Sequence, residues 1–268
     1  MKKLIRFLPP ILTDLYFFYI KKNFFSGNYT SWQSAAEKCI GYDSEIIFKK
    51  VKQATLLVKK GQAVYERDSV IFDSIQYSLP LLSSLLLAAS KNNGHLSLVD
   101  FGGSLGSSYF QNKKFLNELN SVKWNIIEQK HFVEFGQNEL QTNELKFYKQ
   151  IEDCFQYEKP DLLLLSNALQ YIENSYEVLE KLLQYNFYYI FFDMLTLSDK
   201  SDDQIVIQNV SKKIYNASYP CWIFSSNHFK QKMEQNYVLL EEYDTKIKVV
   251  LNREYLQYRS FLFKKKTI

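Results

Sequence analysis

Two different rhythms of apolar and polar positions divide the chain at about residue 91. Before it, apolar residues recur every three or four positions, which is the spacing of one helix face. After it, short apolar runs alternate with helical segments, which is typical of a parallel sheet covered by helices. The expected strands are 96–101, 123–128, 145–148, 161–166, 187–193, 237–243 and 258–264.

The composition and spacing of these strands narrow the fold class. The run 161–166 is almost wholly leucine, as expected of a central strand that is buried on both faces. No helical segment separates 237–243 from 258–264, so the last two strands should form an antiparallel hairpin at one edge. We therefore expect an α/β fold with a doubly wound, seven-stranded Rossmann-like sheet and an antiparallel last strand.

The first third of the chain predicts helices rather than strands. We expect these helices at 11–22, 31–37, 44–60 and 80–91. Ser31 can cap the second helix and Gly61 is placed to end the third. The predicted organisation is a helical N-terminal extension or cap at 1–91, followed by the main domain at 92–268.

The segment 196–224 separates the fifth expected strand from the next expected helix. It exceeds the ~2–6 residues usual for such a connection, and long connections are often lids or binding loops. Its Tyr215 and Tyr219, accompanied by lysines, suit a polar or anionic ligand. We expect a lid over the carboxyl ends of the strands, with an added helix at the sheet edge as the alternative.

The overall composition is that of a globular protein rich in aromatic residues. Hydrophobic residues make up 46% of the 268 residues, aromatic residues 16% and charged residues 23%, which excludes wholesale disorder. Cys39, Cys154 and Cys221 are far apart, so we expect neither a disulfide framework nor a zinc site. No cluster of histidines and carboxylates has metal-ligand spacing, so we expect no metal. These features fit a cytoplasmic protein.

Charge is distributed unevenly along the chain. Residues 1–25 carry a net charge of +4 and residues 264–266 add +3, whereas residues 26–263 carry −3. A nucleic-acid-binding protein should have a basic stripe across its fold, so we expect no nucleic-acid partner. The basic and aromatic segment 1–25 suits peripheral contact with an anionic membrane, such as the inner membrane face. Its alternative role is a helix packed in the core.

The candidate chemistry lies between the first two expected strands. Three of the eight glycines, Gly102, Gly103 and Gly106, directly follow the strand 96–101, where missing side chains let a ligand approach the backbone. Glu128 ends the next strand, where a carboxylate can accept hydrogen bonds from both hydroxyls of a ribose. The alternative is a tight turn without a ligand. The order of strand, glycines, helix, strand and acid favours a nucleoside-containing cofactor.

Two features favour S-adenosylmethionine over a nicotinamide dinucleotide. The turn reads Asp-x-Gly-Gly-x-x-Gly from Asp100, rather than Gly-x-Gly-x-x-Gly. The chain also ends with an expected antiparallel strand, whereas a dinucleotide fold continues with parallel units. Asp100 could then bind the amino group of the methionine portion. A nicotinamide-dependent oxidoreductase on a similar sheet is the alternative enzyme.

Several stretches carry a family resemblance. They are Ser31-Trp32 with Gly41-Tyr42-Asp43, YERDSVIF at 65–72, DFGGSLGSSYFQ at 100–111, Trp124 with Glu128-Gln129, LLSNALQY at 164–171 and YNASYP at 215–220. Over about residues 31–220 the chain resembles the class I S-adenosylmethionine-dependent methyltransferases. More narrowly, it resembles methyltransferases encoded in bacterial surface-polysaccharide gene clusters.

The resemblance implies a cofactor, a reaction type and a class of acceptor. The cofactor is S-adenosylmethionine, and its methyl group goes to an oxygen, or less readily a nitrogen, of a small molecule. The implied acceptor is a sugar, a nucleotide-linked precursor or a phosphoryl-type capsule decoration. The implied cofactor contacts are Asp100, Gly102, Gly103, Ser104, Gly106, Glu128, Gln129 and Ser166. A non-catalytic scaffold with this fold is a further alternative, but it would have no need of both Asp100 and Glu128.

A few other positions are candidates for acceptor binding and catalysis. Glu66, Arg67 and Asp68 precede an apolar segment and could form a helical cover over the cofactor or acceptor, with Arg67 donating to an anionic group; the alternative is a solvated turn. His131 could act as a general base or lie near the adenosine. Asp193 ends the fifth expected strand and should face the crevice above the sheet, as a catalytic residue or as a cap of nearby backbone.

Overall fold

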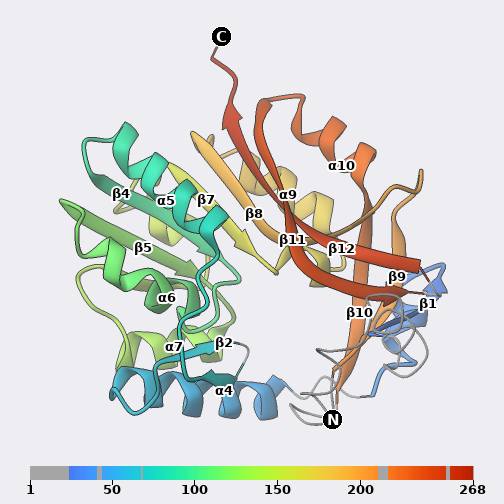
Figure 1. The fold of residues 1–268 in the computed structure, drawn as a ribbon, viewed down its shortest axis with the longest axis horizontal. Coiled ribbons are helices and arrows are strands. Elements are labelled where there is room, and N and C mark those ends of the chain that lie inside the picture. The colour runs from blue at the N-terminus through green and yellow to red at the C-terminus, as the bar shows by residue number, and fades with distance from the viewer. Residues whose placement is uncertain (1–23, 41–43, 68, 211–216, 252–253, 268) are drawn as a thin grey trace, which may run out of the picture.

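The structure is a computed structural model that describes residues 24–40, 44–67, 69–210, 217–251 and 254–267. One large β-sheet runs through the molecule (Figure 1). Its strands are β1 (Phe25–Tyr29), β4 (His95–Phe101), β5 (Ser121–Ile127), β6 (Leu145–Tyr148), β7 (Leu162–Ser166), β8 (Tyr189–Ser198), β9 (Gln204–Asn209), β10 (Ser218–Ser225), β11 (Tyr237–Leu251) and β12 (Glu254–Lys265). The order is β1-β9-β10-β8-β7-β4-β5-β6, with β12 paired to β8 and β11 paired to β12.

The centre of the sheet is parallel. Strands β6, β5, β4, β7 and β8 pair in parallel with their neighbours. Strand β12 joins the other side of β8 in antiparallel orientation, with Phe261 opposite Phe192 and Phe263 opposite Ile190. Strand β11 lies outside β12. These seven strands are the seven expected from the sequence, so the α/β class and the antiparallel last strand are confirmed.

Helices cover both faces of the sheet. They are α3 (Trp32–Ala36), α4 (Ser44–Lys59), α5 (Leu79–Lys91), α6 (Ser107–Leu116), α7 (Lys130–Glu139), α8 (Ile151–Phe155), the short η1 (Leu169–Tyr171), α9 (Ser175–Leu183) and α10 (Ser226–Met233). Leu98 and Leu164 pack with α5, α6 and α7, whereas the next residues, Val99 and Leu165, pack with α8, α9 and α10. In Figure 1, α5 and α6 lie in front of the sheet. The alternation of side chains therefore makes the sheet doubly wound.

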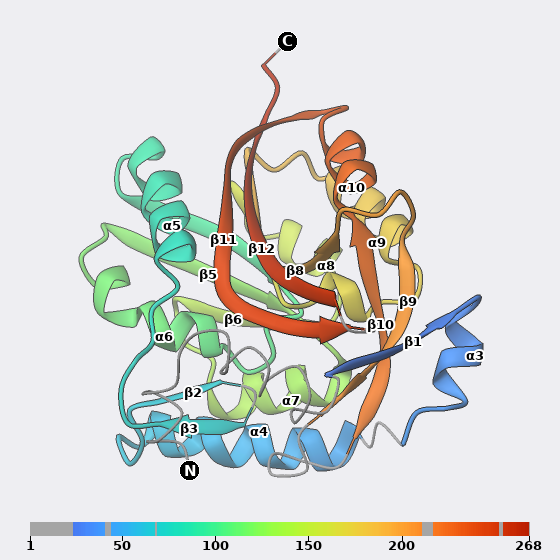
Figure 2. The ribbon, with the colours of Figure 1, turned by 45° about the vertical axis from the view of Figure 1, so that its right-hand side comes forward.

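The described part of the N-terminal extension contains strands as well as helices. Helix α3 begins after Ser31, which caps it as predicted by accepting a hydrogen bond from the N–H of Ser34 at 3.2 Å. Strand β1 pairs with β9, about 180 positions further along the chain, and Gly27 interrupts its pattern with a φ of +82°. Strands β2 (Tyr65–Arg67) and β3 (Val70–Phe72) form a separate hairpin beside α4 (Figure 2). The described part of the extension is therefore mixed rather than helical. The sequence did not indicate β1, because this strand is too short to show a period of two.

The predicted division at residue 91 falls between two elements that pack together. Leu85 and Ala88 of α5 lie in the same hydrophobic cluster as Leu96 and Leu98 of β4. Helix α5 thus covers the sheet as α6 and α7 do. The division into two units stays a prediction.

The segment expected to contact a membrane lies mostly outside the described residues. Residues 1–23 are not described, and Phe25 at its end is fully buried in β1. Within the described ranges, no helix is both long and apolar enough to cross a membrane.

The prediction of a loop or an added helix at 196–224 is wrong. Strand β8 continues to Ser198, and β9 and β10 form an antiparallel pair. Together with β1, which pairs with β9, they extend the sheet from seven strands to ten. Ile205 and Ile207 pack on one face and Val206 on the other, which is strand alternation. The end of β10 pairs in parallel with the end of β8. The sheet therefore divides at β8, because β12 pairs with the first part of β8 and β10 pairs with its last two residues.

The last two strands are longer than expected and strongly bent. Strands β11 and β12 curve from α10 at the top of Figure 2 toward β1, β9 and β10 at the lower right. An irregularity between Asp244 and Lys248 interrupts their register. The far end of the hairpin packs over β1, where Tyr258 contacts Phe25 at 6.5 Å between ring centres. This bend brings the hairpin over the divided part of the sheet.

Candidate functional site

The carboxyl ends of β4 and β7 lie next to the middle of β8, and a residue with strained backbone follows β4, follows β7 and lies within β8. Ser104, Asn167 and Met194 have φ angles of +53°, +52° and +56°, a region that residues other than glycine rarely adopt. Strain of this kind persists only where the surrounding structure holds it, and it clusters at functional sites. This end of the sheet is therefore the candidate site.

Asp100 lies in β4 directly before the glycine turn and is fully buried. Its Oδ2 accepts a hydrogen bond from Trp124 Nε1 at 2.9 Å, whereas its Oδ1 has no hydrogen-bond partner among the described residues. Burial raises the pKa of Asp100 to about 7; the indole hydrogen bond opposes this rise, and the nearby charge of Glu128 adds to it. A cationic group beside Oδ1 would offset the cost of this buried charge.

Gly103 provides the space beside this carboxyl group. A Cβ at Gly103 would lie 2.5 Å from the Cγ of Asp100, a distance that no side chain tolerates. Gly106 has a φ of +91° and forms the N-cap of α6. The glycines are therefore required by the positive φ angles of the turn and by its close packing against Asp100 and Ala168.

Glu128 follows β5 and closes the turn from the other side. Its carboxylate accepts hydrogen bonds from the backbone N–H groups of Gln129 and Ser104. Burial raises the pKa of Glu128, although these two hydrogen bonds oppose the rise. The N–H of Gly102 donates to the carbonyl of Ile127 at 3.0 Å and ties the turn to β5. The structure thus brings the glycine turn, Asp100 and Glu128 together.

A second polar group lies on the neighbouring strands. Asp193 is buried, and its carboxylate accepts hydrogen bonds from Ser166 Oγ at 3.1 Å and Ser260 Oγ at 2.9 Å. The N–H of Asn167 donates to the carbonyl of Asp193 at 2.8 Å. A Cβ at Gly102 would lie 2.8 Å from Ala168, so the glycine turn and the residues after β7 are in close contact. Ser166 and Asp193 therefore lie on strands next to the turn, and their roles in cofactor binding and catalysis stay predictions.

Two residues of β2 reach this end of the sheet from the N-terminal extension. Glu66 is 2% exposed, and its carboxylate accepts hydrogen bonds from the Ser107 hydroxyl and from the N–H of Ser69 at 3.3 Å. Arg67 Nη2 lies 2.8 Å from Met194 Sδ. Successive residues of a strand point in opposite directions, so Glu66 meets α6 while Arg67 meets β8. The predicted helical cover is therefore wrong, because Glu66 and Arg67 belong to a β-hairpin and reach two different places. Asp68 lies outside the described residues.

Tyr219 lies on the far side of β8 from the glycine turn. It is in β10, and its ring packs edge-on against Tyr171 at 5.2 Å between centres. The Tyr171 hydroxyl donates to Gln208 Oε1 at 2.8 Å and also lies 3.3 Å from Asn167 Oδ1. Tyr219 is thus linked through Tyr171 to the strained residue after β7. Tyr215 lies outside the described residues.

His131 and Gln129 occupy the beginning of α7. Gln129 is its exposed N-cap. The ring of His131 packs against Phe48 of α4 and Phe132, at 5.0 and 4.8 Å between centres. Its Nε2 is buried, and no hydrogen-bond partner for it occurs in the described part of the chain. These contacts belong to an aromatic cluster between α4 and α7, and a base role for His131 stays a prediction.

Sequence reasoning missed two polar residues at this site. Ser260 lies in β12 between Arg259 and the apolar run 261–263, and its position next to that run was the only available signal. Gln170 is fully buried, and its Nε2 donates to Asn167 Oδ1 at 2.7 Å and to the Met194 carbonyl at 3.2 Å. Both residues hold the strained backbone in place, because each bonds to Met194 or to its neighbour.

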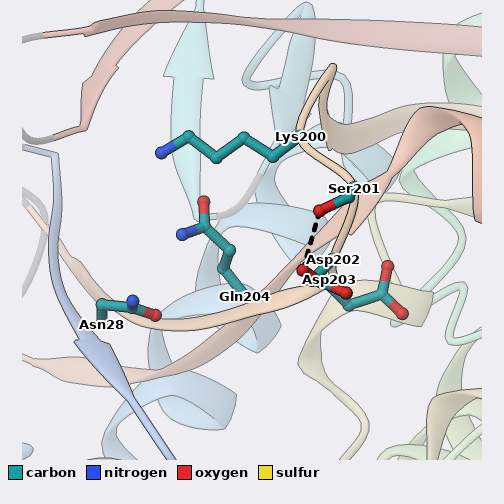
Figure 3. Close-up of a pocket in the computed structure, with 6 residues that line it drawn as sticks. All are labelled: Asn28, Lys200, Ser201, Asp202, Asp203 and Gln204. Carbon is teal, nitrogen blue, oxygen red and sulfur yellow. Dashed lines mark hydrogen bonds between the residues drawn. The ribbon is translucent and has the colours of Figure 1, made fainter.

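A cavity of about 380 Å³ lies away from the glycine turn. Asn28 of β1 and residues 200–204 between β8 and β9 line it (Figure 3). Its acidic groups already have partners: Asp203 accepts from the N–H of Ser225 at 2.6 Å and lies 3.2 Å from His228 Nδ1, and Asp202 accepts from Ser201 Oγ at 2.8 Å. None of the residues that line this cavity belongs to the glycine turn or to its neighbours on β5 and β7, so the cavity is not part of the candidate site.

Comparisons by sequence found no relative. No protein-family model matches the chain, and no curated protein matches it either.

Comparison with solved structures found several with a similar fold. The N-terminal domain of EvdMO1, crystallised with S-adenosylhomocysteine and D-fucose, is 10% identical, with a TM-score of 0.49 over 85% of this chain and 100% of that one. An S-adenosylmethionine-dependent methyltransferase from Clostridium acetobutylicum is 11% identical, with a TM-score of 0.47 over 81% and 98%. The 1,6-didemethyltoxoflavin-N1-methyltransferase from Burkholderia thailandensis is 8% identical, with a TM-score of 0.44 over 85% and 92%. At sequence identities of 8–11% and TM-scores of 0.44–0.49, the likeness concerns the fold, and function depends on the residues of this chain's own site.

Proposed function

We propose that the chain is an S-adenosylmethionine-dependent methyltransferase. The observation that carries this proposal is the pair of carboxylates on either side of the glycine turn. Asp100 presents a buried oxygen without a partner among the described residues, and Glu128 faces the turn backbone through Ser104. The chemistry of this set fits the cofactor, because S-adenosylmethionine carries an ammonium, a sulfonium and two ribose hydroxyls.

The residues of the chain would hold the cofactor by complementary charge and hydrogen bonding. Glu128 accepts from the ribose hydroxyls, and Asp100 offsets positive charge of the methionine portion, directly or through water. Gly102 and Gly103 let the turn pack closely against Ala168 and the carboxyl group of Asp100, which holds that carboxyl group beside the turn backbone. When bound, the cofactor supplies a methyl group that its sulfonium already activates, so the protein mainly aligns the acceptor and excludes water.

We place the acceptor on the side of β8, between Arg67, Asp193 and Tyr219. The guanidinium of Arg67 beside Met194 supports an acceptor with an anionic or strongly polar group. The Tyr171–Tyr219 pair supports an acceptor with a flat or ring-shaped part. The proposed reaction is O-methylation of a sugar, a nucleotide-linked precursor or a phosphoryl-type decoration of a surface polysaccharide. Asp193 is the proposed base if the acceptor hydroxyl has to lose its proton.

Calorimetric titration with S-adenosylhomocysteine tests the cofactor assignment. Wild type should bind it, and NAD should not bind. Glu128→Ala should weaken binding by about 1.5–3 kcal/mol, because charge-assisted hydrogen bonds to the ribose are lost. Glu118→Ala, an exposed carboxyl group beyond the end of α6, is the matched control and should bind as wild type does. Equal affinity of wild type and Glu128→Ala would remove the assignment.

A further inference from the structure

We infer that Glu66 binds the ammonium group of the cofactor's amino-acid portion, so that the β2–β3 hairpin completes the cofactor site. The inference rests on the proposed function and names a residue from outside the main domain for that site. The sequence had placed Glu66 on the acceptor side, together with Arg67.

The position of Glu66 is the first argument. Glu66 is in the middle of β2 and pairs with Ile71 of β3. It is 2% exposed and lies against the beginning of α6, the helix that follows the glycine turn. Ser107, the first residue of α6, donates its hydroxyl hydrogen to Glu66 Oε1. A carboxylate from the N-terminal extension is thus held beside the turn that would carry the cofactor.

The hairpin is built to hold this carboxylate. Ser69 lies in the turn between β2 and β3 with a φ of +68°, and its N–H donates to Glu66 Oε2 at 3.3 Å. The adjacent Tyr65 is also buried and stacks on Phe72 at 5.8 Å between ring centres. Burying a carboxylate costs free energy unless charge and hydrogen bonds compensate it. The hairpin and Ser107 therefore fix the Glu66 carboxylate at the beginning of α6.

The charges around the turn indicate which ligand group Glu66 would take. Asp100 and Glu128 approach the same turn from β4 and β5, and the buried Oδ1 of Asp100 is without a hydrogen-bond partner in the described ranges. Three carboxylates around one turn favour a ligand with more than one positive charge. With Glu128 at the ribose, the ammonium of the amino-acid portion is the group left for Glu66 and Asp100 to share.

Two ligands separate this role from a structural one. S-adenosylhomocysteine carries the amino-acid portion, whereas 5′-methylthioadenosine lacks it and keeps the adenosine and sulfur. By calorimetry, Glu66→Gln should weaken S-adenosylhomocysteine binding by about tenfold or more, the range of one charge-assisted hydrogen bond. Binding of 5′-methylthioadenosine should change less than about twofold. Glu128→Gln is the matched control and should weaken both ligands alike.

The other outcomes would overturn the inference. If Glu66→Gln weakens both ligands equally, Glu66 only holds the hairpin against α6. If it weakens neither, Glu66 does not touch the cofactor. Should Glu66→Gln fail to fold, Glu66→Asp replaces it as the test, because its side chain keeps the charge but is one methylene shorter. Glu66→Asp must then weaken S-adenosylhomocysteine binding more than 5′-methylthioadenosine binding. If wild type binds neither ligand, both the proposed function and this inference are wrong. If wild type binds S-adenosylhomocysteine and the Glu66 variant binds it with the same affinity, only the inference is wrong.

Discussion

Replacing Asp100 by asparagine should stabilise the protein increasingly as the pH rises. Asp100 is fully buried and its pKa is raised from 3.8 to about 7. Between these two values the folded protein keeps a proton that the unfolded chain has released. The folded state is therefore destabilised as the pH rises through this window, and the full cost is present above pH 7.

The size of the effect follows from the two pKa values. At about 1.4 kcal/mol for each pH unit, a rise from 3.8 to about 7 corresponds to a cost of about 4 kcal/mol at pH 8. At pH 5 only about 2 kcal/mol of this cost is present. The amide introduced by Asp100→Asn cannot ionise, and its oxygen can still accept the hydrogen bond from Trp124. The stability difference between Asp100→Asn and wild type should thus grow by about 2–3 kcal/mol from pH 5 to pH 8.

Urea unfolding at several pH values, followed by tryptophan fluorescence, measures this difference. Using the change with pH removes any constant cost of the new amide group. Asp73→Asn, at an exposed carboxyl group in the loop after β3, is the matched control and should show no such growth. A difference between Asp100→Asn and wild type that stays constant from pH 5 to pH 8 would refute the reasoning. It would mean that the buried carboxyl group is solvated or compensated in the free protein.

Three further predictions concern the turn and the N-terminus. Gly103→Ala should cost about 1–3 kcal/mol of stability and abolish S-adenosylhomocysteine binding, because its Cβ would meet the carboxyl group of Asp100; a variant that melts and binds like wild type would contradict this. Trp124→Phe should cost about 1–3 kcal/mol more at pH 8 than at pH 4, where Asp100 is neutral, because it removes the indole donor to a charged acceptor; equal losses at both pH values in urea unfolding would contradict it. Deleting residues 1–23 should lower co-sedimentation with anionic vesicles, with each basic residue near the surface contributing about 1 kcal/mol; unchanged binding at low salt would exclude membrane contact through this segment.

Local patterns were sufficient for the parallel sheet and for the turn. Leucines at every position of 162–165 require burial on both faces, and the structure places them alternately in two clusters on opposite faces. Asp100, the glycines and Glu128 lie within 29 residues of one another, and each sits at a strand end. Because parallel neighbouring strands end at the same edge, their order along the chain already indicates that these groups lie near one another.

Contacts between distant segments decided the rest. Strand β1 pairs with β9, and Arg67 contacts Met194, which lies 127 positions further along the chain. Short strands such as β1 and β2 have too few residues to show a period. Each is stabilised by its partner strand, and the sequence alone does not identify that partner. The segment 196–224 is a further example. Its alternating residues form the β9–β10 pair, and this pair is anchored to the sheet where the end of β10 pairs with the end of β8.

The direction of single side chains was also decided by tertiary structure. In the sequence Glu66 and Arg67 form one charged cluster, but strand pairing turns one toward α6 and the other toward β8. The fold class and the glycine turn therefore followed from periodicity and turn chemistry, which act over a few residues. The assignment of Glu66, the extended sheet and the support of Asp193 by Ser260 depended on pairing between elements far apart in the chain, which only packing of the whole molecule specifies.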